Sequence, residues 1–140
     1  MQGTAPRRCD PIAVDMIESG HRRGPAKSFR ELVVWQRAIE LTTAIYRLTR
    51  QFPREEMYGL TSQLRRAGIS VASNIAEGYG RATRGEYRNF VGMARASALE
   101  IQTQLIIAGH LGFGDPGEIA KAEQLADQTS KMLWSLSKHL

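Results

Sequence analysis

The chain has 140 residues, of which 42% are hydrophobic and 24% charged, and this composition is that of one globular domain. It excludes a chain that is disordered throughout. The longest uncharged stretch, residues 101–114, is shorter than the roughly 20 apolar residues that a membrane-spanning helix needs. The single cysteine forms neither an internal disulfide nor a zinc site, and no apolar signal core follows the N-terminal arginines, so we expect a cytoplasmic protein.

The net charge of +5 comes from the first two thirds of the chain. Residues 1–27 carry five basic and three acidic groups (+2), residues 28–95 carry eleven arginines and six acids (+5), and residues 96–140 carry three lysines and five acids (−2). Such a surplus is compatible with a polyanionic partner, but it is also common in proteins that need charge only for solubility.

Residues 1–27 are predicted to be a disordered leader, because they hold three prolines, three glycines and scattered charge without a sustained period. The remaining residues, 28–140, form the predicted folded domain. Ser28 and Glu31 have the spacing of a capping box, which predicts a first long helix from Phe29 to about Gln51. Pro53 ends it.

This first helix carries two apolar stripes about 120° apart. One consists of Leu32, Trp35, Ile39, Thr42 and Tyr46, and the other of Val34, Ala38, Leu41, Ile45 and Leu48. Together they cover about 200°, which is more than one bundle interior uses, so we predict that the second stripe is an oligomer interface. The alternative is that the leader or the long loop folds over it, and a sedimentation measurement would separate the two.

A second helical period runs between Tyr58 and Tyr87. Its apolar stripe is Leu60, Leu64, Ala67, Val71 and Ile75, its small-residue flank is Gly68, Ala72 and Ala76, and its polar stripe is Gln63, Arg66, Ser70, Asn74 and Glu77. The small flank predicts close packing against another helix. We interpret the polar stripe as a hydrogen-bonded network with Ser97 and Glu100 of the next helix. The alternative is that it lines a groove or channel in an oligomer.

A third helix is predicted from Thr83 to Leu111, where glycines end it. A fourth begins with Asp115 as N-cap and Pro116 in the first helical position, and its apolar residues alternate three and four apart up to Leu140. Four helices joined by short loops predict an all-α fold, an antiparallel up-and-down four-helix bundle.

Neither a cofactor nor a metal site is predicted. Gly112, Gly114 and Gly117 spell G-x-G-x-x-G, but the dinucleotide motif follows a strand, whereas a helix precedes these glycines. The three histidines lie far apart in the sequence, and no carboxylate pair suits acid–base chemistry. We therefore expect a protein that is not an enzyme.

Arginines form a stripe on the third helix. Arg84, Arg88 and Arg95 share one face, Arg81 lies just before the helix, and Arg37 and Arg65 are candidates to extend the patch. Guanidinium groups pair with phosphates, and nearby tyrosines provide rings for unpaired bases, so these arginines are predicted to bind nucleic acid. The alternative is a solvated arginine face that supports the helix.

Several motifs are specific enough to indicate a family. They are Phe52-Pro53, Tyr58-Gly59-Leu60, Arg66-Ala67, Asn74-Ile75-Ala76-Glu77-Gly78, and Ser97 with Glu100. With them, residues 29–140 resemble the bacterial four-helix-bundle proteins encoded in the intervening sequences of 23S ribosomal RNA. The resemblance implies a homo-oligomer, since pentameric rings are reported for that family.

A related group serves as the accessory subunit of diversity-generating retroelements, in which a basic pentamer engages a reverse transcriptase and nucleic acid. The resemblance thus suggests a non-enzymatic, ring-forming bundle that binds RNA, or an RNA-handling protein such as a reverse transcriptase, through its arginines. We expect no membrane partner. The alternative is a structural protein–protein interaction module that binds no nucleic acid.

Overall fold

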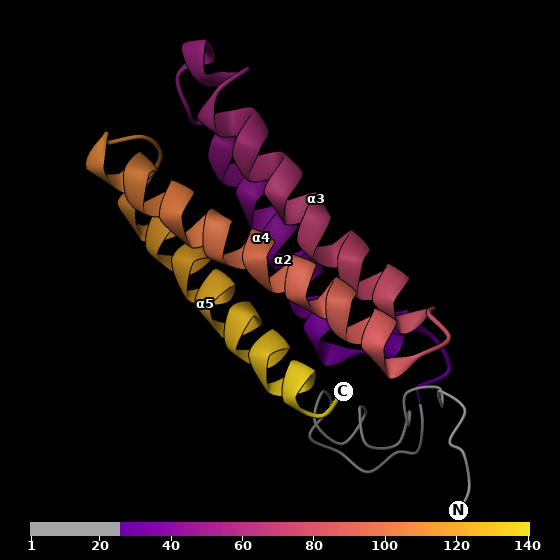
Figure 1. Ribbon diagram of the computed structural model, residues 1–140. Helices are drawn as coiled ribbons and strands as arrows, with labels where there is room; N and C mark the ends of the chain where they lie inside the picture. Colours follow the sequence, from indigo (N-terminus) through magenta and orange to yellow (C-terminus); the bar gives the residue numbers. More distant parts are fainter. Residues whose placement is uncertain (1–25) are drawn as a thin grey trace, which may run out of the picture.

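The structure, a computed structural model, describes residues 26–140 and is all α-helical over that range. The elements are η1 (Phe29–Glu31), α2 (Val33–Thr49), η2 (Arg54–Glu56), α3 (Leu60–Tyr79), α4 (Arg84–His110) and α5 (Pro116–Lys138) (Figure 1). The prediction of a four-helix bundle is confirmed. The predicted leader lies outside the described residues, apart from Ala26 and Lys27.

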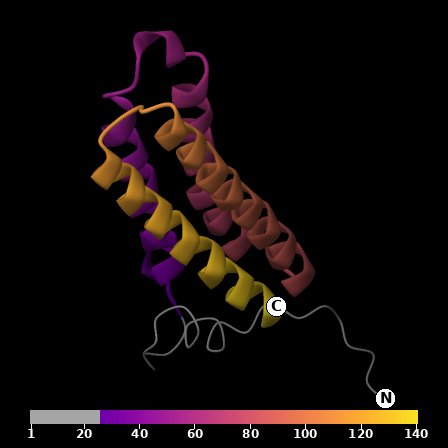
Figure 2. The same cartoon turned by 90° about the vertical axis from the view of Figure 1, so that its left-hand side faces the viewer.

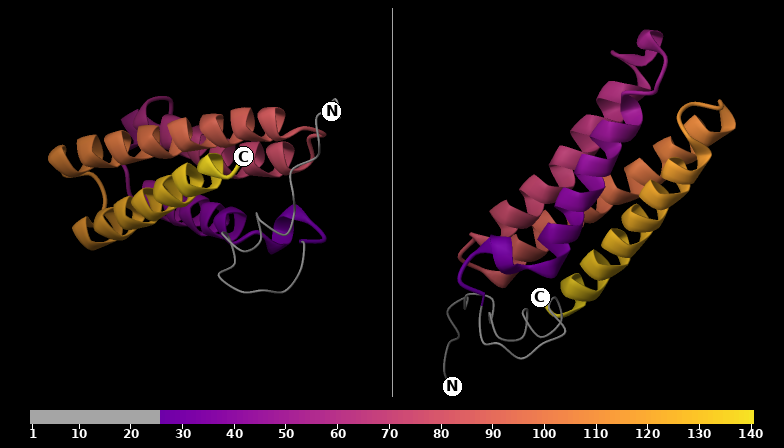
Figure 3. Two further views of the ribbon diagram at one scale, coloured as in Figure 1. Left: turned by 60° about the horizontal axis from the view of Figure 1, so that its bottom comes forward. Right: turned by 180° about the vertical axis from the view of Figure 1, so that it is seen from behind.

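Each long helix runs antiparallel to the one before it (Figures 1 and 2). The α2–α3 and α4–α5 connections lie at one end of the bundle, and the α3–α4 turn, the start of α2 and the C-terminus lie at the other (Figure 1). α4 packs against α3 and α5, and α2 packs against the same two helices from the other side (Figure 3). α2 and α4 are therefore diagonal neighbours.

The core is formed by one apolar side of each long helix. The α5 seam is buried along its whole predicted length, at Ile119, Ala122, Ala126, Thr129, Leu133, Leu136 and Leu140. The small-residue flank of α3 packs closely against another helix, as predicted. A Cβ on Gly68 would lie 3.2 Å from the Thr42 side chain of α2. The Thr42 hydroxyl donates a hydrogen bond of 2.9 Å to the Gly68 carbonyl oxygen, so α2 and α3 are in close backbone contact there.

α2 begins four residues later than predicted. Ser28 accepts a hydrogen bond from the Arg30 backbone N–H, and Glu31 accepts one from the Lys27 backbone N–H, but these caps close only the 3-10 turn η1. Leu32 then adopts an extended conformation, with ψ of 125°, and is buried. The chain thus turns at Leu32 to bury this side chain in the core before α2 starts.

The oligomer interface predicted on this helix is wrong. Its residues, Val34, Ala38, Leu41, Ile45 and Leu48, are each at most 1% exposed within a single chain. They face the centre of the bundle, so a second copy cannot contact them. The other stripe packs partly on α3, through Thr42, and on η1, where the Trp35 and Phe29 rings meet edge to face at 5.3 Å. Periodicity alone does not tell which of two apolar stripes turns inward.

Gly114 supports a prediction about stability. Its φ is +72°, and an added Cβ would lie 2.8 Å from Leu48 Cδ1, whereas Gly112 has a φ of +73° and nothing within 4 Å of such a Cβ. We expect Gly114→Ala to lower the free energy of unfolding by about 2 kcal/mol, and Gly112→Ala by about 1 kcal/mol, because only the former adds a clash to the backbone strain. Urea denaturation followed by circular dichroism measures both. Equal losses would mean that the contact with Leu48 contributes nothing.

Candidate nucleic-acid interface

The edge between α4 and α5 gathers the predicted arginines near the end of the bundle that holds the α3–α4 turn. Thr83 caps α4 by accepting a hydrogen bond of 3.1 Å from the Glu86 backbone N–H, and this fixes where the helix starts. From there, Arg84, Arg88 and Arg95 recur on one face of α4, the face toward α5. Arg88 donates a hydrogen bond to the Leu140 carbonyl oxygen beyond α5.

Trp134 of α5 lies at the centre of this edge, although the sequence pattern did not single it out. The Arg95 guanidinium carbon is 4.6 Å from the centre of the indole ring, and the Lys138 ammonium is 5.0 Å from it. The tryptophan residue is nevertheless 48% exposed. The sequence feature that could have indicated this contact is a tryptophan outside the apolar seam of α5, one helical turn before a lysine.

Arg81 extends the same basic region around the α3–α4 turn. Its guanidinium carbon lies 4.5 Å from the centre of the Phe90 ring. The ion pairs in the described part of the chain are Arg37–Glu40 and Lys131–Asp127, so no acidic group neutralises any of the four predicted arginines around α4. Their positive charge therefore remains available to an anionic ligand.

One acid, Asp127, also lies on the α4–α5 edge. It is paired with Lys131 at 2.9 Å and accepts a hydrogen bond of 3.4 Å from Gln102 of α4. The hydrogen bond from Lys131 is the main cause that lowers the pKa of Asp127, which therefore stays ionised at neutral pH. Because Lys131 neutralises the charge of Asp127, the net charge of the α4–α5 edge stays positive.

Arg37 and Arg65 do not extend the patch, so this part of the prediction is wrong. Arg37 pairs with Glu40 on α2 at 3.0 Å, and α2 is diagonal to α4. Arg65 donates a hydrogen bond of 2.9 Å to Thr49 and lies 4.7 Å from the Tyr46 ring centre, on the side of α3 that faces α2. Both arginines serve contacts elsewhere in the bundle, which spacing along the sequence does not reveal.

The polar stripe of α3 forms the predicted network with α4 in part. The Ser70 and Ser97 hydroxyls are 2.8 Å apart, and Asn74 donates to Ser70 on its own helix. Gln104 donates to Gln63 at 3.2 Å and to Glu100 at 3.1 Å, which adds a residue that the sequence reading missed. These bonds join α3 to α4 and favour one alignment of the two helices.

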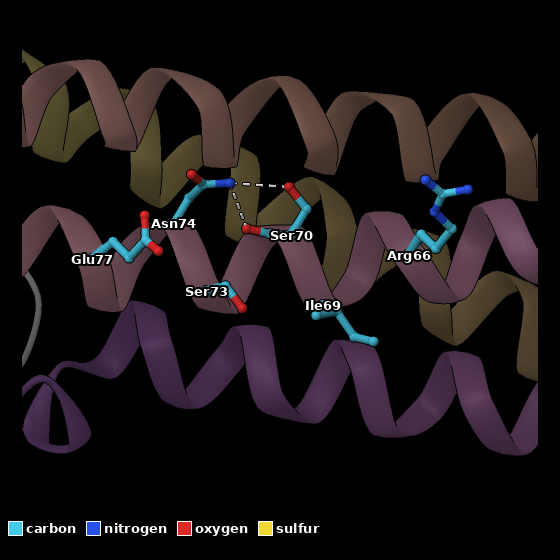
Figure 4. Close-up of a pocket in the computed structure, with 6 residues that line it drawn as sticks. All are labelled: Arg66, Ile69, Ser70, Ser73, Asn74 and Glu77. Carbon is cyan, nitrogen blue, oxygen red and sulfur yellow. Dashed lines mark hydrogen bonds between the residues drawn. The ribbon is translucent and has the colours of Figure 1, made fainter.

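Arg66 and Glu77 are the members of the stripe that have no partner among residues 26–140. They lie at opposite ends of the outer side of α3, with Ile69, Ser70 and Ser73 between them (Figure 4). Arg66 also lines an open groove of about 530 Å³ between α3 and α4, together with Gln63, Ser70, Ser97 and Glu100. This surface thus presents one cation and one anion that are unpaired among the described residues.

The outward side of α4, from this groove round to the α4–α5 edge, is apolar. Met93, Leu99, Ile106 and Ile107 are between 42 and 48% exposed, with Gly92, Ala96 and Thr103 among them. From residue 89 to residue 110, Glu100 and Arg95 are the charged residues, and Arg95 is turned toward α5. The uncharged stretch at residues 101–114 contains Ile106 and Ile107, but the sequence analysis did not predict this face, which we call the α4 face.

Two other features, a metal-binding cluster and a membrane-spanning helix, do not occur within residues 26–140. Among the described residues, no three or more histidine, cysteine or acidic side chains are placed to hold a metal ion. No helix within residues 26–140 is long and apolar enough to cross a membrane.

Comparison with known families identifies the chain. The sequence profile of the 23S rRNA-intervening sequence protein family matches residues 30–135, which include nearly all of the bundle. The chain belongs to this family. The membership predicted from the sequence motifs is confirmed. A search of curated proteins found no match.

A solved structure shares the fold. It is a crystal structure from Bacteroides thetaiotaomicron, described as a protein with unknown function from the S23 ribosomal protein family. The TM-score is 0.69 at 20% sequence identity, and the match covers 76% of this chain and 96% of that one. At this identity the likeness supports the four-helix fold and nothing about the ligand.

Proposed function

We propose that this protein is a non-enzymatic, homo-oligomeric four-helix bundle that binds nucleic acid, RNA in the first place, along its α4–α5 edge. The observation that carries the proposal is the row of Arg84, Arg88 and Arg95 with no acidic partner in the described residues, beside an exposed indole ring. Arginine binds phosphate through two parallel hydrogen bonds, and aromatic rings stack on bases. Membership of a family named for an RNA sequence element supports RNA as the nucleic acid.

Self-association is the second part of the proposal, and we place it on the α4 face. An exposed face with four large apolar side chains and few charges is typical of a surface that another protein covers. In the neighbouring polar stripe, Arg66 and Glu77 have no partner within residues 26–140, and a second copy of the chain supplies a charge of each sign to pair with them. The family resemblance makes a ring of five copies the expected assembly, which a heterologous contact of this kind can close.

The experiment for RNA binding uses Arg84→Gln with Arg88→Gln. For a mixed pool of single-stranded RNA, we expect the wild-type affinity to fall steeply as salt rises, because bound arginines release counterions from the phosphates. The double variant should bind about tenfold more weakly at low salt, and the slope of log K against log salt should become shallower by about 1.4. Fluorescence anisotropy of a labelled RNA measures both quantities.

Arg47→Gln with Arg50→Gln is the matched control. Both arginines belong to the far side of the bundle, at the end of α2, and their loss changes the net charge by the same amount. We expect this variant to keep the wild-type salt slope. Absence of RNA binding by the wild-type protein at low salt would contradict the proposed function, and equal losses in both variants would place the RNA on another surface.

A further inference from the structure

The indole ring of Trp134 is held in place by cations and still open to solvent. Arg95 reaches it from α4 and Lys138 reaches it from the next turn of α5, at 4.6 and 5.0 Å from the ring centre. A tryptophan packed only for stability is normally more deeply buried than one that is 48% exposed. The adjacent core position, Leu133, is fully buried, so the helix already has its apolar anchor at this turn.

The contacts of Trp134 reduce the entropic cost of using it as a binding surface. Because two cationic side chains pack on the ring, its rotamer is restricted before any ligand arrives. Both cations are side chains long enough to turn from the ring toward a phosphate beside a stacked base. Arg88 stands two helical turns before Arg95 on the same face of α4 and continues the positive row.

We propose that Trp134 is a stacking platform for an unpaired base of single-stranded RNA, with Arg95, Lys138 and Arg88 contacting the phosphates on either side of it. This inference rests on the proposed function and specifies its ligand as single-stranded. In a duplex the base faces are already stacked on each other, so a lone tryptophan at the protein surface has no face to contact. In a single strand every base offers a face, and stacking is tolerant of sequence.

The test uses fluorescence from Trp134 alone. The chain has two tryptophans, and Trp35→Phe leaves Trp134 as the one reporter while keeping an aromatic ring beside Phe29. Titration with a single-stranded oligoadenylate of twelve nucleotides should quench the emission in step with binding measured by anisotropy of the labelled RNA. A duplex RNA of the same length should leave the emission unchanged. The converse variant, Trp134→Phe, should show no quenching of Trp35.

Affinity provides an independent readout. We expect Trp134→Ala to weaken binding of the oligoadenylate about 10- to 100-fold, and Trp134→Phe to keep most of it, since a phenyl ring still stacks. Trp134→Lys adds a positive charge but removes the ring. It should therefore also weaken binding, which separates stacking from electrostatic attraction. Circular dichroism checks that each variant keeps the helical content of the wild type, as expected for a half-exposed side chain.

The failures of the two proposals are distinguishable. If the single strand binds with unchanged Trp134 emission, and Trp134→Ala binds as tightly as wild type, the stacking site is overturned while RNA binding stands. If Trp134→Lys binds more tightly than wild type, the edge acts through charge and the stacking site is likewise overturned. If no RNA binds at low salt, the proposed function fails and the stacking site fails with it.

Discussion

Leu41→Lys is expected to unfold the protein. Leu41 is fully buried in the centre of the bundle, and the substitution removes its apolar contacts and places an ammonium group within the apolar core. The loss of packing and the burial of an unpaired charge together cost about 5 kcal/mol or more, which approaches the roughly 5–15 kcal/mol that stabilises an ordinary domain. Circular dichroism and urea denaturation should show a largely unfolded chain at neutral pH.

Ile39→Lys is the control for this prediction, since it adds the same group to the same helix at a side chain that is 40% exposed. It should keep the helical content and lose less than about 1 kcal/mol. The comparison also tests whether the Leu41 stripe of α2 belongs to the core or to an interface between copies. A Leu41→Lys protein that stays folded as a smaller species would restore the α2 interface that the burial of this stripe excludes.

The second large effect is expected at the α4 face, where lysines should separate the copies without unfolding them. Leu99 and Ile107 are two turns apart on the outward side of α4 and both are exposed in the single chain. Leu99→Lys with Ile107→Lys should therefore barely change the stability of the monomer. In an assembly, however, it would place two desolvated, unpaired charges in each contact. Sedimentation equilibrium should show the mass fall from that of the oligomer to 15.6 kDa.

Gln124→Lys with Gln128→Lys adds the same charge to the exposed side of α5 and should leave the mass of the oligomer unchanged. A double variant at Leu99 and Ile107 that keeps the wild-type mass would show that the copies meet elsewhere. A wild-type protein that sediments at 15.6 kDa at every concentration would contradict self-association as a whole.

Local signals in the sequence were enough to predict the fold and to assign the family. The uninterrupted α5 seam, the Asp115 cap followed by Pro116, and the start of the third helix at Thr83 each depend on residues within one or two turns, and the structure contains all three. The same holds for the row Arg84, Arg88 and Arg95, because i, i+4 and i+11 spacing on one helix sets a common face whatever the helix packs against.

Contacts between helices were decided only by the tertiary structure. Both stripes of α2 were predominantly apolar, and the inward one was selected by the close approach of α3 at Gly68, which directs Thr42 toward α3 and Leu41 toward the centre. For the same reason Arg65 faces α2 and not the α4–α5 edge. Trp134 of α5 contacts Arg95 of α4, and the spacing of residues within one helix cannot predict a contact between two helices. Periodicity determines which residues share a side of a helix, but the rotation of each helix about its own axis depends on what its neighbours allow it to bury.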